Sequence, residues 1–257
     1  MNIIDTHAHL DHVENISEAL KEADASGVEG IMAVGVDFES NRRNLEIKKN
    51  YSKPKIYVGL GIHPGDIKTE EVEESLEFIR ENIAQAHAIG ETGLDFWYKW
   101  VKKDDAKKDE QRTVFRMQLK IAREYNLPVI IHSRGAWQEC LAMTKEEQIQ
   151  KAVFHWYSGP VDVLAGIIEQ GYYVSCTPSL AYSEPAQEAI KKAPIERVLI
   201  ETDTPVYYRN KETGEGFKSG PKDVVNTLGL YAKFKGVAEA DAVAIFNNNA
   251  KVLFNLD

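Results

Sequence analysis

The chain has 257 residues, of which 43% are hydrophobic and 28% charged, and these proportions exclude a disordered or membrane-spanning protein. Its 40 acidic residues outnumber its 31 basic residues and give a formal net charge of -9, which excludes non-specific attraction to phosphate over the whole surface. Any nucleic-acid site must therefore be local or assisted by metal ions.

Short apolar runs recur about every 25 to 30 residues, and each is followed by a stretch compatible with a helix, which is typical of repeated βα units. Most of these runs lack polar alternation, as expected for parallel strands that are covered on both faces. The expected strands are Asn2 to Asp5, Gly30 to Val34, Lys55 to Leu60, Ala86 to Ile89, Pro128 to Ile131, Ala152 to Phe154, Tyr172 to Ser175 and Arg197 to Ile200.

Amphipathic segments lie between these runs, and two examples are Val72 to Asn82 and Val114 to Tyr125. Eight units over this length correspond to about 32 residues each, close to the size typical of a (β/α)₈ TIM barrel. We therefore predict one TIM-barrel domain spanning residues 1–257, with a doubly wound open sheet as the structural alternative.

Two connections are longer than the fold requires, Asp95 to Asp109 and Pro205 to Pro221. Each follows an expected strand, at the end of the barrel where active sites are built, and long ordered loops are often functional. The alternative is that both are solvated surface segments. For the part of the first loop that is rich in lysine and aspartate, we expect the solvated alternative.

Polar residues with metal-ligand chemistry follow several of the expected strands. His7 and His9 are two positions apart, so on an extended chain both side chains point to the same face. In a closed barrel, side chains at the carboxyl ends of different strands converge on one mouth. The other residues in such positions are Glu91, His132, His155 and Asp203.

Buried charges are costly unless they are paired or bound to metal, so this cluster is best explained by divalent cations. His7, His9 and Asp203 would hold one cation, His132 and His155 a second, and Glu91 would bridge the two. Two cations about 3.5 to 4 Å apart can hold a hydroxide as the nucleophile and polarise a phosphoryl or carbonyl oxygen. Asp203 is the expected general base and Glu91 the alternative.

At these residues the sequence resembles the TatD family of metal-dependent hydrolases, within the amidohydrolase-like barrels. Six motifs occur in order along nearly the whole chain: Asp5 to Asp11, Gly61 to Pro64, Gly90 to Asp95, Leu127 to Arg134, Phe154 to Gly159 and Glu201 to Pro205. The resemblance implies a TIM-like barrel and phosphodiester hydrolysis, usually described as deoxyribonuclease activity. It also implies a two-cation site on the six residues His7, His9, Glu91, His132, His155 and Asp203.

The resemblance further implies that His63 faces the substrate, although the surrounding glycines and proline also suit a structural turn. Arg134 is a candidate for binding phosphate through its planar guanidinium, or for pairing with a neighbouring acid. Asp11 and Asp95 either orient ligand histidines or serve as turn and capping residues. Cys140 is expected to be a buried packing residue.

The favoured function is an exonuclease acting on DNA ends, using two divalent cations per chain that are zinc, manganese or magnesium. Aromatic residues would stack on bases or else pack helices against the barrel, and Trp97, Tyr157, Tyr207 and Tyr208 are candidates. The alternatives are a binuclear hydrolase of a small-molecule amide, lactone or phosphate ester, and a non-enzymatic binding protein.

Neither a targeting segment nor an obligate protein partner is indicated by the sequence. The amino terminus lacks a basic region followed by an apolar stretch and a cleavage site. Two cysteines are too few for a disulfide framework. We therefore expect a cytoplasmic protein with no membrane contact.

Overall fold

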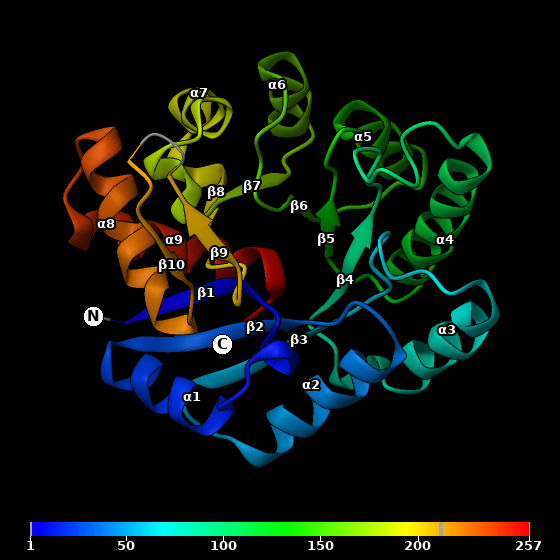
Figure 1. Ribbon diagram of the computed structural model, residues 1–257, viewed down its shortest axis with the longest axis horizontal. Coiled ribbons are helices and arrows are strands. Elements are labelled where there is room, and N and C mark those ends of the chain that lie inside the picture. The colour runs from blue at the N-terminus through cyan, green and yellow to red at the C-terminus, as the bar shows by residue number, and fades with distance from the viewer. Residues whose placement is uncertain (1, 211–212, 257) are drawn as a thin grey trace.

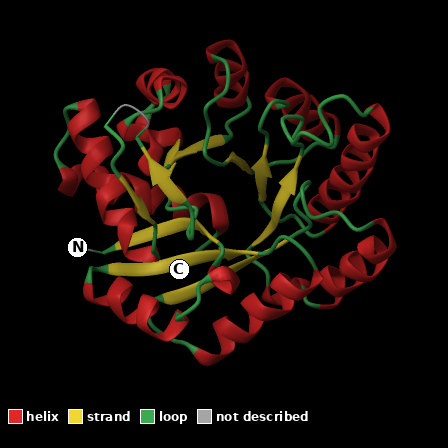
Figure 2. Ribbon diagram, viewed as in Figure 1, coloured by secondary structure: helices red, strands yellow, loops and turns green. Residues whose placement is uncertain are grey.

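The computed structural model describes residues 2–210 and 213–256. Eight parallel strands lie side by side in chain order, and helices surround them (Figures 1 and 2). The strands are β1 (Ile3–Ala8), β2 (Val28–Val34), β3 (Lys55–Leu60), β4 (Ala88–Gly93), β5 (Val129–His132), β6 (Ala152–Phe154), β7 (Tyr173–Cys176) and β8 (Val198–Ile200).

One helix follows each of the first seven strands, and two follow the last. They are α1 (Ile16–Ala25), α2 (Phe38–Asn50), α3 (Val72–Glu81), α4 (Asp105–Glu124), α5 (Trp137–Glu146), α6 (Val161–Glu169), α7 (Glu184–Lys192), α8 (Val224–Lys235) and α9 (Glu239–Phe254). A short antiparallel hairpin, β9 (Tyr207–Arg209) and β10 (Gly216–Lys218), precedes α8. None of the helices in the described part of the chain is both long and apolar enough to cross a membrane.

The sheet closes on itself where its first and last strands meet. There the backbone N–H of Asp203 donates to the carbonyl of His7 at 3.0 Å, and the N–H of His9 donates to the carbonyl of Thr204 at 2.7 Å. A single parallel bridge joins Ala8 to Thr204. The predicted TIM barrel is therefore confirmed, and the alternative of an open doubly wound sheet is wrong.

Two apolar cores hold the barrel together. The larger lies between the strands and the surrounding helices, as the burial of both strand faces requires. The smaller fills the barrel interior, where Ile4, Met32 and Leu199 pack with residues from other strands. Leu253 and Phe254 of α9 belong to this inner cluster and close the end opposite the candidate site. The mouth is thus left to polar side chains.

The predicted strand boundaries differ from the observed ones mainly at two strands. The first strand was expected to end at Asp5, but β1 continues through His7 to Ala8. The fourth was expected to end at Ile89, but β4 begins at Ala88 and includes Glu91. Both extensions carry buried polar residues, which a search for apolar runs leaves out. His87 precedes β4, at the opposite end of the barrel from the site.

Both predicted loops contain regular structure. The last residues of the segment Asp95 to Asp109 are not a solvated loop, because α4 begins at Asp105 and Asp104 caps it by accepting from the N–H of Lys107. The segment Pro205 to Pro221 contains the β9–β10 hairpin. Its positions 211 and 212 lie outside the described residues.

Candidate metal centre

All six predicted ligands meet at the carboxyl ends of the barrel strands. His7 lies in β1, Glu91 in β4, and His132 is the last residue of β5. His155 directly follows β6, and the remaining two residues, His9 and Asp203, follow β1 and β8. The six come from five different strands, so only the closed barrel brings them together.

Four donor atoms from these residues surround one point. The Nε2 atom of His7 lies 3.3 Å from Glu91 Oε2 and 3.3 Å from Asp203 Oδ1. The Nε2 atom of His9 lies 3.4 and 3.3 Å from the same two oxygens. Ligands 2.0 to 2.2 Å from a tetrahedral cation stand about 3.3 to 3.6 Å apart. The donor set therefore fits a cation at its centre.

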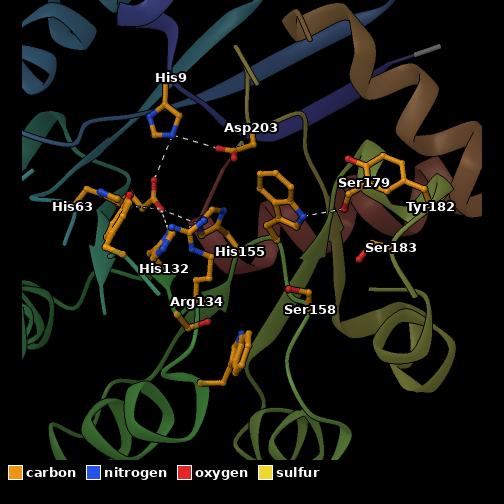
Figure 3. Close-up of a pocket in the computed structure, with 15 residues that line it drawn as sticks. His9, His63, His132, Arg134, His155, Ser158, Ser179, Tyr182, Ser183 and Asp203 are labelled. Carbon is orange, nitrogen blue, oxygen red and sulfur yellow. Dashed lines mark hydrogen bonds and ion pairs between the residues drawn. The ribbon is translucent and has the colours of Figure 1, made fainter. Parts of the chain in front are cut away.

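The other carboxylate oxygen of Glu91 faces a second pair of imidazole rings. Its Oε1 atom lies 2.8 Å from His132 Nδ1 and 2.8 Å from His155 Nε2, and these two ring nitrogens are 3.2 Å apart. Four imidazoles thus lie within 3.4 Å of this one carboxylate, two at each oxygen. Figure 3 shows His9, His132, His155 and Asp203 pointing into the same pocket.

Several buried polar atoms of this cluster have no hydrogen-bond partner among the described residues, including both ring nitrogens of His7 and the Oδ1 atom of Asp203. Burial would raise the pKa of Asp203, but the adjacent His9 imidazole and the other nearby imidazoles lower it to about 2. Burial would lower the pKa of His9, but Asp203 and Glu91 raise it to about 9. A cation at this position would bind the free lone pairs of these nitrogen and oxygen atoms and neutralise the buried carboxylates.

His63 and Arg134, the two predicted substrate-binding residues, both line the pocket at this centre. The Nε2 atom of His63 lies 3.7 Å from Glu91 Oε1, and its Nδ1 atom lies 2.8 Å from Asp66 Oδ2. Burial lowers the pKa of His63, which favours its neutral form. A neutral ring there can donate one hydrogen bond to a substrate.

Arg134 and His132 share Asp95. The Oδ2 atom of Asp95 lies 2.8 Å from His132 Nε2 and accepts from the Nε–H of Arg134 at 2.8 Å. Asp95 is therefore placed to orient a ligand histidine, and Arg134 does pair with a neighbouring acid. Asp11 instead lies 3.2 Å from His12 through its Oδ2 atom.

Glu201 also lies inside the cluster, although no role was predicted for it. Its side chain is fully buried, and its two oxygens lie 3.7 Å from His7 Nδ1 and 3.6 Å from His155 Nδ1. The signal that could have found it is its spacing of two from Asp203, the same spacing that singled out His7 and His9.

The pocket over the centre has a volume of about 430 Å³, within the range of small-ligand sites. Figure 3 shows Ser158, Ser179, Tyr182 and Ser183 on the side away from the imidazoles. The Oγ atom of Ser179 accepts from the indole N–H of Trp156 at 2.9 Å. One side of the pocket is therefore lined by imidazoles and carboxylates, and the other side by hydroxyl groups.

Two of the four candidate stacking aromatics are packing residues. Tyr157 and Tyr208 are 1% and 2% exposed, and their hydroxyls donate to the backbone carbonyls of Pro160 and Thr202. Trp97 and Tyr207 are 56% and 62% exposed and remain available for contact with a ligand. Cys140 is buried, as predicted.

An eight-stranded TIM barrel whose mouth gathers imidazoles and carboxylates belongs to the class of metal-dependent barrel hydrolases. A model of the family described as TatD related DNase matches residues 4–255. The chain belongs to the TatD family of metal-dependent hydrolases, as its motifs predicted.

Individual relatives resemble the chain along almost its whole length. The Bacillus subtilis protein named uncharacterized metal-dependent hydrolase YabD is 33% identical over 264 residues, covering 99% of this chain and 100% of that protein. Human deoxyribonuclease TATDN3 is 25% identical, covering 99% of this chain and 95% of that protein. The crystal structure of YjjV, a TatD homologue from Escherichia coli K12, has 26% identity and a TM-score of 0.87, covering 99% of this chain and 98% of that one.

Proposed function

We propose that the protein is a two-cation phosphodiesterase that removes nucleotides from the ends of DNA. The observation that carries the proposal is the position of Glu91, whose two oxygens each face a separate pair of imidazoles. This geometry suits a carboxylate that bridges two cations, which are zinc, manganese or magnesium. Hydrolysis of DNA by a relative is indicated by the name of the human protein, deoxyribonuclease TATDN3.

When bound, the two cations would lower the pKa of the attacking water and polarise the phosphoryl oxygen. Protein side chains would accept the proton and bind the phosphate. The carboxylate of Asp203 would accept the proton of that water, because it borders the pocket beside the imidazoles. His63 and Arg134 would donate hydrogen bonds to the phosphate oxygens and hold the phosphate in place.

The pocket is small enough to favour a chain end over an internal stretch of duplex. Its volume of about 430 Å³ corresponds to a small ligand. The hydroxyl-bearing wall of Ser158, Ser179, Tyr182 and Ser183 offers hydrogen bonds to a sugar or a base edge. We therefore assign the end nucleotide to this pocket.

The segment from Trp97 to Lys103 supports a single-stranded DNA substrate beyond that pocket. Trp100 is 58% exposed and stacks on Tyr98, with ring centroids 4.3 Å apart, and Tyr98 in turn lines the pocket. Lys99, Lys102 and Lys103 are exposed in the same segment of the chain. Aromatic side chains interleaved with cations bind single strands by stacking on bases and neutralising phosphates, even on an acidic protein.

Replacing Trp100 by alanine is expected to weaken binding of a short single-stranded oligothymidylate by about 10-fold, because stacking one base contributes about 1–3 kcal/mol. Fluorescence anisotropy with the labelled oligonucleotide in EDTA would measure the dissociation constant without hydrolysis. Phe234→Ala is the matched control, since Phe234 is 39% exposed but lies at the carboxyl end of α8, away from the mouth. Equal weakening by both variants would contradict the stacking role.

The activity itself is tested with end-labelled single-stranded and duplex DNA in magnesium, manganese and zinc in turn. We expect stepwise shortening from one end of the strand. If protein that holds two cations cleaves neither DNA but hydrolyses a panel of small amides, lactones or phosphate esters, the exonuclease proposal is wrong. In that case the binuclear small-molecule hydrolase replaces it.

We further propose that the chain is one domain and that it works in the cytoplasm. All eight strands pair in one sheet, which supports a single domain. The cytoplasmic location is supported by Cys140 and Cys176, which are both free and buried, because unpaired cysteines suit a reducing compartment.

A further inference from the structure

We propose that Trp156 is a specificity-determining residue whose indole ring stacks on the base of the end nucleotide and favours a purine there. The inference deepens the proposed function, because it rests on the assignment of an end nucleotide to the pocket. It adds the side chain that recognises the base and the class of base that is preferred.

The indole ring of Trp156 forms part of the pocket wall. Trp156 lines the pocket together with His155 and Asp203. Tyr157 and Tyr208 are 1% and 2% exposed, whereas Trp156 is only half-buried. A ring that served packing alone would be covered in the same way as these two tyrosines. Part of the indole therefore stays accessible to a molecule in the pocket.

The backbone of Trp156 is held in an unusual conformation. Its φ of 40° lies in the left-handed region, which bulky residues rarely adopt. Its N–H donates to Ser175 Oγ at 3.0 Å and to Glu201 Oε1 at 2.8 Å, and these hydrogen bonds hold the backbone in place. Strained residues that are held in this way cluster at ligand sites. The conformation therefore favours a role for Trp156 in binding.

Two contacts fix the ring itself. Its Nε1–H donates to Ser179 Oγ at 2.9 Å, and Figure 3 draws this hydrogen bond at Ser179. The Oγ atom of Ser179 in turn lies 2.8 Å from Thr177 Oγ1. The ring of Tyr208 packs against the indole, with centroids 5.4 Å apart and planes at 48°. A ring that is already fixed loses little conformational freedom when a ligand binds, so its contacts add more fully to affinity.

A fixed aromatic surface beside a centre that binds phosphate suits a nucleobase. Every base has a flat face that can stack on an aromatic ring, and base preferences follow from the strength of stacking. The indole has two fused rings, as a purine has, whereas a pyrimidine has one. A purine at the cleaved end should therefore bind more tightly than a pyrimidine. A phosphate ester without an aromatic group should gain nothing from Trp156.

The test compares three ligands that carry the same anchoring group, with the full chain in the presence of Zn²⁺. They are the 5′-phosphorothioates of deoxyadenosine, of thymidine and of deoxyribose without a base, and calorimetry gives their dissociation constants. We expect the wild type to bind the deoxyadenosine compound most tightly and the compound without a base least tightly. Trp156→Ala should weaken binding of the deoxyadenosine compound by about 10-fold and leave the compound without a base unchanged.

Two further variants serve as controls. Trp156→Phe keeps an aromatic ring and should retain part of the preference for a base. Alanine and phenylalanine are no better suited than tryptophan to a φ of 40°, so both variants keep the conformational strain of the wild type. Tyr125→Ala should match the wild type, since Tyr125 is 40% exposed but lies at the carboxyl end of α4, away from the mouth.

Several outcomes would overturn the role of Trp156. One is unchanged binding of the deoxyadenosine compound in Trp156→Ala. Another is equal weakening of all three compounds in that variant, which would make Trp156 only a support for the pocket. A wild type that binds none of the compounds, or binds all three equally, would also overturn it. Equal binding of the deoxyadenosine and thymidine compounds alone would overturn the purine preference.

The inference and the proposed function can fail separately. If the wild type shows the base preference that depends on Trp156 but cleaves no DNA end, the exonuclease proposal is wrong and the stacking role stands. If the wild type shortens DNA from its ends and Trp156→Ala keeps the full base preference, the exonuclease proposal stands and the stacking role is wrong.

Discussion

Replacing Glu91 by alanine is expected to reduce turnover by about 10³-fold or more and to lower the number of bound divalent cations from two to one or none. Both groups of imidazoles meet on this one carboxylate, at distances of 2.8 to 3.4 Å. Removing even a single electrostatic stabiliser of a transition state costs about 10²- to 10³-fold. The loss of a bridge should exceed that, because it also changes the metal content.

Metal analysis together with single-turnover kinetics measures this effect, and two further variants isolate its cause. Glu91→Gln preserves side-chain volume but only one of the two ligating oxygens, so it should keep the fold and lose most activity. Glu147→Ala removes another buried carboxylate, paired with Arg116 and Arg123 away from the mouth. That variant should lose stability but keep its cations. Full activity and two cations in Glu91→Ala would refute the bridging role.

Replacing Asp203 by asparagine is expected to lower kcat by about 10²- to 10⁴-fold, the range contributed by a positioned general base. Asparagine is a close match for this position, because Asp203 has a φ of 48° and asparagine tolerates that left-handed region better than most residues. The backbone should therefore stay in place while the proton acceptor and one charged ligand are lost.

The measurement for Asp203→Asn is kcat and KM on whichever substrate the wild type hydrolyses, with metal content determined on the same preparation. The site formed by His132, His155 and Glu91 should keep its cation. Asp162→Asn, an exposed aspartate on α6, is the control and should leave both kinetic constants unchanged. A kcat close to that of the wild type would exclude Asp203 as the base and turn attention to Glu91.

The sequence predicted the barrel well because its strands are short apolar runs with helix-compatible segments between them. All eight strands occur, and the helix expected from Val72 begins at that residue. The predictions were wrong where polar residues belong to regular structure. Thr6 and His7 extend β1 because the barrel mouth buries them, and the charged start of α4 forms a helix because Asp104 caps it.

For the site, residue type and position at a strand end were sufficient to predict that the six candidate ligands lie together. The contacts between individual side chains could not be predicted in this way. Glu201 and Asp95 lie against the rings of His155 and His132, which are far from them in the sequence. Likewise, burial separated Tyr157 and Tyr208, which pack, from Trp97, which is exposed. Aromatic residues in loops carry no periodic pattern that would separate these cases.

The closure between β1 and the residues after β8 sets the order in which the site can be assembled. A cation held by His7, His9 and Asp203 would connect the beginning of the chain to a residue about four-fifths of the way along it. During synthesis, a nascent chain could already contain Glu91, His132 and His155 and still be unable to complete that cluster. The complete set of ligands would then be present only after the final strand has emerged and docked, so an incomplete molecule would have no complete metal centre.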